Sequence, residues 1–308
     1  MRPSFLLRKV RESKWKENEA HFLKKQLVYD VDEKKNLNYM GDGNTFHNLD
    51  IYEPKGSAEA LPVIVQIHGG GYISLDKFIN EAQGKYFAQQ GFRVVNINYS
   101  LQPEADFTEV MREIFCAMRW VEENAEKYGM DTDRLFVYGD SAGGHYAMLT
   151  GVIQNNPSMQ EYYKVVPLSC KIRGIAVSCP MYEIQGIREK NDFASLFLRR
   201  ILLPGSRKKD DTYVNNVSIP TLLEREEFPE IFLLTTPTDE VLYREVRSLH
   251  ELLEQKGIAH RYREYTSAER TLGHVFHATD PEFPESEQAN HDILDYFLEL
   301  ITRKRETQ

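Results

Sequence analysis

The sequence predicts an α/β fold built on a mostly parallel, doubly wound sheet. The segment LPVIVQIH (61–68) is almost continuously apolar, and FRVVNINY (92–99) and RLFVYG (134–139) are also expected to be strands. A continuous apolar run is typical of a strand that is covered on both faces. Stretches with helical spacing separate these segments, and strands that alternate with helices usually pair in parallel. With 308 residues and 41% hydrophobic content, the chain is expected to form one α/β domain over residues 1–308.

The beginning of the chain has a different pattern of apolar and polar residues. The segments QLVYDV (26–31) and HNLDIY (47–52) alternate apolar and polar residues, and GDGN (41–44) offers a tight turn between them. This pattern predicts an antiparallel hairpin that opens the sheet. Residues 1–25 mix charged and apolar positions in a way that favours an amphipathic helix.

The remaining elements follow in alternation. Four apolar residues at 110, 114, 118 and 121 mark one face of a helix. The long segment 180–229 breaks the alternation of strands and helices, and we expect it to be an insertion over one edge of the sheet. The other expected elements are a helix within 81–91, a helix from Ser141, strands at 173–179, 230–236 and 260–265, and helices at 193–203, 244–257 and 287–303.

The composition of the chain limits the kinds of partner that it is expected to bind. The net charge of -9, from 38 basic and 47 acidic residues, argues against a nucleic-acid-binding surface. Three cysteines without metal-like spacing are expected to be free thiols. The only apolar run near the N-terminus, residues 5–7, is too short for a signal-peptide core, and no later segment approaches a membrane span. We therefore expect a cytoplasmic protein without a membrane partner.

The octapeptide YGDSAGGH (138–145) places Ser141 directly after a predicted strand and at the start of a helix. Ligands gather at the carboxyl ends of strands in such a sheet. Gly139 and Gly143 lack a Cβ and so relieve crowding at a sharp turn. The helix N-terminus presents amide donors to negative charge. The pattern predicts an exposed, nucleophilic serine.

A serine nucleophile requires a base. His274, in TLGHVFH after the last strand, is the first candidate, and His277 is its rival. Two histidines could also form part of a metal site, but no cysteine or carboxylate cluster along the sequence completes one. No metal and no cofactor are expected.

The base requires an orienting acid, and Asp239 in TDEVL follows the strand at 230–236. The alternative is that Asp239 only caps the following helix, and Glu240 is the neighbouring rival. A glycine loop, HGGGY (68–72), follows the strand at 61–68. Its exposed amides would bind an oxyanion, with His68 as a brace for the loop.

These motifs together resemble the hormone-sensitive-lipase-like branch of the α/β-hydrolase esterases, from about residue 47 to the C-terminus. The motifs that carry the resemblance are HGGGY, YGDSAGGH, TDEVL and GHVFH. The order serine, aspartate, histidine is also that of α/β-hydrolases. The acid loop is closer to compact bacterial acetyl- or feruloyl-esterase-like members.

The resemblance implies roles for individual residues and, by analogy, a cap that includes residues 1–45. It implies Ser141 as nucleophile, His274 as base, Asp239 as acid, oxyanion-binding amides at Gly70, Gly71 and Ala142, and Tyr72 beside the acyl site. Phe276 is a further candidate for lining the cleft. Tyr182, Phe193, Leu196 and Phe197 would either wall an acyl pocket or pack a helix on the sheet.

The expected function is that of a serine carboxylesterase acting on small-molecule, short-chain acyl esters. Two alternatives stay open. One is a serine peptidase or amidase of the same fold, and the other is a ligand-binding protein on a hydrolase scaffold that has lost catalysis.

Overall fold

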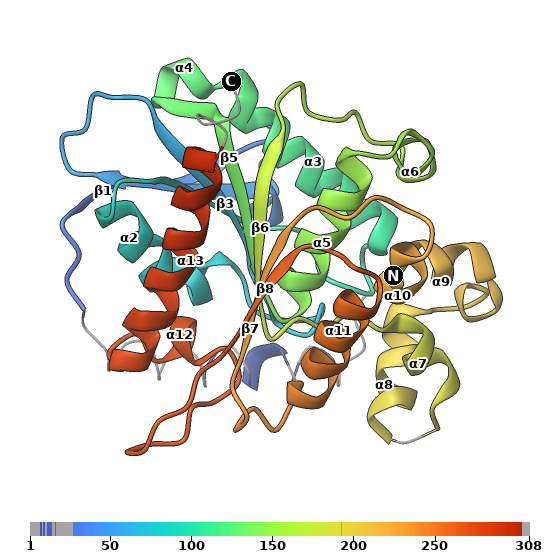
Figure 1. Ribbon diagram of the computed structural model, residues 1–308. Coiled ribbons are helices and arrows are strands. Elements are labelled where there is room, and N and C mark those ends of the chain that lie inside the picture. The colour runs from blue at the N-terminus through green and yellow to red at the C-terminus, as the bar shows by residue number, and fades with distance from the viewer. Residues whose placement is uncertain are drawn as a thin grey trace.

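The computed structural model describes residues 7, 9, 11–13, 16, 27–191 and 193–303. Their strands form one sheet in the order β1-β2-β4-β3-β5-β6-β7-β8 (Figure 1). β1 and β2 pair antiparallel, as do β2 and β4, and all other neighbours are parallel. The strands are β1 Val31–Asn38, β2 Asn48–Pro54, β3 Leu61–Ile67, β4 Arg93–Ile97, β5 Met130–Asp140, β6 Ile172–Ser178, β7 Ile231–Thr235 and β8 His260–Glu264. The predicted mostly parallel sheet with an antiparallel opening hairpin is confirmed.

The first strand lies further along the chain than expected. It was predicted at 26–31, but the pairing runs from Val31 opposite Pro54 to Asn38 opposite Asn48. The residues next to the connection between the two strands form the pairs. The first strand is therefore the polar stretch VDEKKNLN. This strand is the edge of the sheet, where charged residues discourage pairing with another chain.

Helices cover both faces of the sheet (Figure 1). α2, α12 and α13 lie on one face, and α3, α5 and α11 lie on the other. The bounds are α2 Glu81–Gln89, α3 Phe107–Glu123, α4 Ala125–Tyr128, α5 Ala142–Gln154, α6 Pro157–Tyr163, α11 Tyr243–Gln255, α12 Phe276–Thr279 and α13 Pro284–Arg303. The strands therefore have to be apolar on both sides, and β3 sends Val63, Val65 and Ile67 into one hydrophobic cluster and Ile64 into the other.

Four short helices stand between β6 and β7, where the alternation of the sequence is interrupted. They are α7 Ile184–Glu189, α8 Phe193–Leu202, α9 Asp211–Val217 and α10 Ile219–Leu223. α8 corresponds to the helix predicted at 193–203. In Figure 1 this group lies beside the end of the sheet at which β7 leads toward α11.

The helix predicted at residues 1–25 lies mostly outside the described residues. Leu7 is buried in the larger hydrophobic cluster. The Arg11 guanidinium donates to the carbonyls of Ile73 and Gln102 and pairs with Glu104. Part of the segment 1–45 is thus β1 of the sheet, and another part contacts the chain just after the glycine loop.

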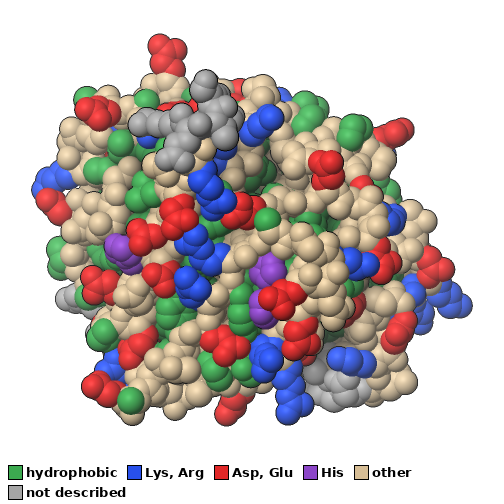
Figure 2. All heavy atoms as spheres, viewed as in Figure 1, with side chains coloured by type: hydrophobic (Ala, Val, Ile, Leu, Met, Phe, Trp, Pro, Cys, Tyr) green, Lys and Arg blue, Asp and Glu red, His purple; other side chains and the backbone are tan. Residues whose placement is uncertain are grey.

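The surface in view carries Lys, Arg, Asp and Glu side chains interspersed, without a field of one sign (Figure 2). None of the described helices combines the length and the apolar character needed to cross a bilayer.

Candidate active site

Ser141 occupies the sharp turn between β5 and α5. Its backbone has φ 51° and ψ -118°, a conformation that costs a non-glycine residue about 1–3 kcal/mol. Three backbone hydrogen bonds hold it there. The Ser141 N–H donates to the Ser178 carbonyl at 2.8 Å, and the Ser141 carbonyl accepts from Met181 at 3.1 Å and from His145 at 3.3 Å.

The glycines around Ser141 are required by close backbone contacts. A Cβ on Gly139 would lie 2.3 Å from the Gly143 carbonyl oxygen, and a Cβ on Gly143 would lie 2.0 Å from the Ile67 carbonyl oxygen. Gly144 packs against Pro180 in the same way. The helix therefore starts in contact with the ends of β3 and β5, and this contact forces the turn at Ser141.

Ser141, His274 and Asp239 form a hydrogen-bonded series although they are far apart in the chain. His274 Nε2 lies 3.0 Å from Ser141 Oγ, and His274 Nδ1 lies 2.8 Å from Asp239 Oδ2. With the proton on Nδ1, the ring donates to the carboxylate and accepts from the hydroxyl. The His274 side chain is 22% exposed, whereas that of Asp239 is fully buried. The structure thus brings the three predicted side chains together.

Asp239 uses its two carboxylate oxygens for two purposes. Oδ2 contacts His274, while Oδ1 accepts from the N–H groups of Val241 and Leu242, just before α11 begins at Tyr243. Both bonds lie in the turn before α11, whose N-cap is Leu242 and carries no side-chain capping bond, so the capping alternative for Asp239 is wrong. The neighbouring Glu240 is exposed.

Charge and burial shift the pKa values of both Asp239 and His274. Burial acts to raise the pKa of Asp239, but the hydrogen bond and charge of His274 and the two backbone donors lower it below its usual range. Burial acts to lower the pKa of His274, but the contacts with Asp239 and with the Cys179 thiol raise it above its usual value. The acid and the imidazolium stabilise each other's charged forms.

The rival histidine is in a different environment. His277 is completely buried, and its Nε2 lies 2.9 Å from the Tyr138 hydroxyl. Burial, helped by the charge of His274, lowers the pKa of His277 to about 3. A ring that stays neutral and packed on Tyr138 is a structural histidine.

The glycine loop presents donors beside Ser141. Within the described residues, the N–H groups of Gly70, Gly71 and Ala142 have no hydrogen-bond acceptor. The loop reaches the serine through Gly69, where a Cβ would lie 3.1 Å from the Ser141 Cβ. These unpaired donors are the ones predicted for an oxyanion.

Asp140 holds this loop in place, and the sequence analysis did not assign it a role. One oxygen accepts from the Gly69 N–H at 3.1 Å, and the other accepts from Asn80 Nδ2 at 2.8 Å. Burial raises the pKa of Asp140 to about 6, although both hydrogen bonds act in the opposite direction. Its position directly before Ser141 in the motif was the available signal.

His68 braces the loop from the other side. Its Nδ1 donates to the Gly69 carbonyl at 2.7 Å, and its ring stacks on Tyr99 with 4.3 Å between centroids. Burial lowers the pKa of His68 to about 4, so the ring stays neutral. The predicted bracing contact is present.

The two aromatic residues expected at the substrate are both fully buried. The Tyr72 hydroxyl lies 2.8 Å from Nδ1 of His145, whose Nε2 donates to the Val217 carbonyl. Phe276 packs in the hydrophobic cluster that contains Tyr265. Because neither ring has exposed surface, the expected contact with substrate has no support in their positions.

Cys179 is a second residue that the sequence analysis did not place here. It follows β6 directly, it is fully buried, and its thiol, Asp239 and His274 offer ligand atoms that all lie within 4.8 Å of one another. No cysteine or carboxylate cluster along the sequence accompanies His274, but the ends of β6 and β7 bring Cys179 and Asp239 to it in space.

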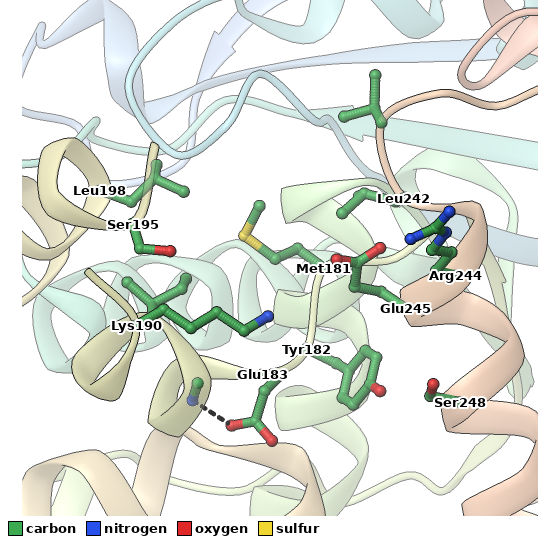
Figure 3. A pocket seen from close by; sticks show the side chains of 13 residues that line it. Met181, Tyr182, Glu183, Lys190, Ser195, Leu198, Leu242, Arg244, Glu245 and Ser248 are labelled. Carbon is green, nitrogen blue, oxygen red and sulfur yellow. Dashed lines mark hydrogen bonds between the residues drawn. The ribbon is translucent and has the colours of Figure 1, made fainter. Parts of the chain in front are cut away.

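A cavity of about 600 Å³ lies between α7, α8 and the start of α11, and its lining includes neither Ser141 nor His274 (Figure 3). Met181 lines it, and its N–H holds the Ser141 carbonyl. Ser195 and Leu198 come from α8, and Arg244, Glu245 and Ser248 come from α11, so the wall mixes charged, polar and apolar side chains. Lys190 extends from the end of α7 toward the α11 wall.

The residues proposed to wall an acyl pocket lie in different environments. Tyr182 lines the cavity, whereas Leu196 is 46% exposed and Phe197 packs against the core. The Phe193 side chain lies outside the described residues.

Comparison with known proteins places this site in a family. The BD-FAE family model matches residues 49–253. Carboxylesterase NlhH of Mycobacterium tuberculosis is 36% identical over 115 residues, which are 37% of this chain and 35% of that protein. Hormone-sensitive lipase of Homo sapiens is 31% identical over 124 residues, which are 39% of this chain and 12% of the lipase. The chain thus spans only about a third of NlhH and a smaller part of the lipase.

The fold is shared with a solved esterase. Esterase B from Lactobacillus rhamnosis superposes with a TM-score of 0.89 at 23% identity, covering 98% of this chain and 96% of that one. These findings confirm the α/β-hydrolase fold and the resemblance to the hormone-sensitive-lipase-like branch.

The contact between Gly143 and β3 predicts a loss of stability on substitution. In Gly143→Ala the new Cβ meets the Ile67 carbonyl at 2.0 Å, and we expect the free energy of unfolding to fall by about 3 kcal/mol. Gly273→Ala is the matched control beside His274, since a Cβ there has no heavy atom within 4 Å, and it should stay within about 0.5 kcal/mol of the parent. Urea unfolding measures both, and equal stability of the two variants would contradict the packing argument.

Proposed function

Because the chain belongs to the BD-FAE family, we propose that it is a serine carboxylesterase that hydrolyses short-chain acyl esters through an acyl-enzyme on Ser141. The observation that carries this proposal is the series Asp239–His274–Ser141, with contacts of 2.8 and 3.0 Å. Its members match the chemistry of acyl transfer to a serine hydroxyl.

The first half of the reaction forms the acyl-enzyme. His274 Nε2 takes the hydroxyl proton as Ser141 Oγ attacks the ester carbonyl, and the Asp239 carboxylate stabilises the imidazolium that results. The N–H groups of Gly70, Gly71 and Ala142 would bind the oxyanion of the tetrahedral intermediate, where the loss of one donor costs about 3 kcal/mol. The imidazolium then protonates the leaving alcohol.

Water completes the second half by the same route. His274 removes a proton from water, the hydroxide attacks the acyl carbonyl, and Ser141 leaves as the alcohol when it regains a proton from the imidazolium. The N–H donors are held in place before the reaction by Asp140 and His68 through Gly69, so the donors need no reorganisation as the charge develops.

The cavity beside Met181 supports a small acyl group and a polar alcohol. A long alkyl chain in it would remove the ends of Lys190 and Glu245 from water and give them no hydrogen bond in return, which is costly. A C4-C4 tributyrin phosphonate inhibits esterase B, whose fold this chain shares. Esters with short acyl chains therefore agree best with a mixed lining that includes charged side chains.

The role of Ser141 as nucleophile is tested by removing its hydroxyl oxygen. We expect Ser141→Ala to lose ester hydrolysis and to lose covalent labelling by a fluorophosphonate, because among the described residues no other hydroxyl is hydrogen-bonded to His274. Ser169→Ala, which alters an exposed serine, should keep both. Labelled protein is detected by mass spectrometry, and turnover or labelling at the parental level in Ser141→Ala would refute the assignment.

The role of Asp239 as the acid is tested by the dependence of ester hydrolysis on pH. Neutral His274 is the active form, and Asp239 raises its pKa, so kcat/KM should rise with pH along a limb that lies above the usual histidine value of about 6.5. Asp239→Asn removes the charge, and we expect kcat to fall about 10⁴-fold and the remaining limb to move to lower pH.

Glu240→Gln changes the neighbouring exposed carboxylate and is the control, with all rates measured in the presence of a chelator. A limb that stays at the same pH in Asp239→Asn would show that Asp239 does not act on His274.

Acyl length is tested with p-nitrophenyl esters from acetate to dodecanoate. We expect kcat/KM to be highest at about two to four acyl carbons, because longer chains desolvate the charged wall. A maximum at the long-chain esters would contradict the short-chain part of the proposal and leave the serine mechanism intact.

A further inference from the structure

Cys179 is a buried nucleophile next to the site that the proposed reaction does not use. Its backbone takes a positive φ of 42°, which is uncommon for a residue with a side chain. The Cys179 N–H donates to the Leu234 carbonyl at 2.9 Å, and its thiol donates to the Thr235 hydroxyl at 3.7 Å. Contacts with β7 thus hold the sulfur in a defined place.

Three different ligand types meet at this point. The Cys179 sulfur, an Asp239 oxygen and a His274 nitrogen lie within 4.8 Å of one another. Zn²⁺ binds these donors at about 2.0–2.3 Å, so tetrahedral ligand atoms lie about 3.5 Å apart. Small movements of the His274 ring would bring the three atoms to that spacing.

We propose that Cys179, Asp239 and His274 form an inhibitory binding site for a thiophilic divalent cation, Zn²⁺ first among them. A sulfur, nitrogen and oxygen donor set suits Zn²⁺, whereas Mg²⁺ and Ca²⁺ prefer oxygen ligands alone. The site leaves a fourth position for water, as zinc sites with three protein ligands do. That the bound ion inhibits rests on the proposed function, but the binding itself does not.

Binding and hydrolysis exclude each other because they use the same groups. The ion takes the thiolate, so the thiol proton passes to solvent. It also takes a nitrogen lone pair of His274 and an oxygen of Asp239, which breaks the contact between them. A coordinated imidazole is held away from its place between the carboxylate and the hydroxyl, and Ser141 then has no base.

Solvent reaches the three ligands through His274. Its side chain is 22% exposed, while Asp239 and Cys179 are buried. The ion therefore arrives from the side of the substrate, and bound substrate should protect the enzyme.

The experiment uses metal-free enzyme, Zn²⁺ for inhibition and Cd²⁺ as a spectroscopic probe. We expect Zn²⁺ to abolish ester hydrolysis, a chelator to restore it, and Mg²⁺ at the same concentration to leave it unchanged. Cd²⁺ should give the ultraviolet charge-transfer absorption of a metal–thiolate bond. In Cys179→Ala this absorption should disappear, and the inhibitory Zn²⁺ concentration should rise by about 100-fold.

Cys116→Ala is the control, since Cys116 is a half-buried free thiol on α3, and it should respond to both ions as the parent does. Each variant is compared with its own metal-free rate. Equal inhibition of the parent and Cys179→Ala, or no cadmium–thiolate absorption in the parent, overturns the proposal. If the enzyme hydrolyses no ester, the cadmium absorption still reports the site, so failure of the function and failure of the metal site are distinguishable.

Discussion

The strained backbone of Ser141 is the constraint on which the rest of the site depends. A φ of 51° is stable here only because the chain cannot relax. Gly143 packs on the end of β3, the Ser141 N–H is bonded to the end of β6, and the Met181 N–H is bonded to the Ser141 carbonyl. Since three neighbouring segments hold the turn, the hydroxyl stays in one place, and the loops after β7 and β8 only have to supply Asp239 and His274.

Two buried aspartates, one at the end of β5 and one after β7, show how the same residue type is given opposite properties. Asp140 has only neutral donors as partners, and burial raises its pKa to about 6. Asp239 faces His274, and that contact lowers its pKa despite burial. The first holds the glycine loop through Gly69. The second keeps its charge near neutral pH and so stabilises an imidazolium. The partner, more than the degree of burial, decides the role of each carboxylate.

The mostly parallel sheet with its antiparallel opening and the meeting of Ser141, Asp239 and His274 could be predicted because they follow from local pattern. Apolar runs identify strands, and parallel strands place their carboxyl ends together. The register of β1 could not be predicted, since its polar sequence VDEKKNLN pairs through the backbone and shows little periodicity. Asp140 and Cys179 were missed for another reason. Their roles depend on neighbours that are distant in the chain, since Asp140 at the end of β5 bonds the loop after β3 and Cys179 after β6 contacts β7. The burial of Tyr72 depends likewise on His145, which lies one helix turn beyond the serine.

The proposed hydrolase site and the proposed zinc site draw on the same donors, because the Cys179 thiol lies beside His274 and Asp239. An imidazole made electron-rich by a carboxylate is a good base, and for the same reason it is a good metal ligand. The hydroxyl, carboxylate and imidazole alone offer one nitrogen ligand and otherwise only oxygen ligands. This set binds Zn²⁺ weakly unless a third strong donor is added. Cys179 supplies that donor at the end of β6. Burial then limits how fast an ion arrives but not how tightly it is held, so access past His274 governs the rate of any inhibition while the sulfur governs its strength.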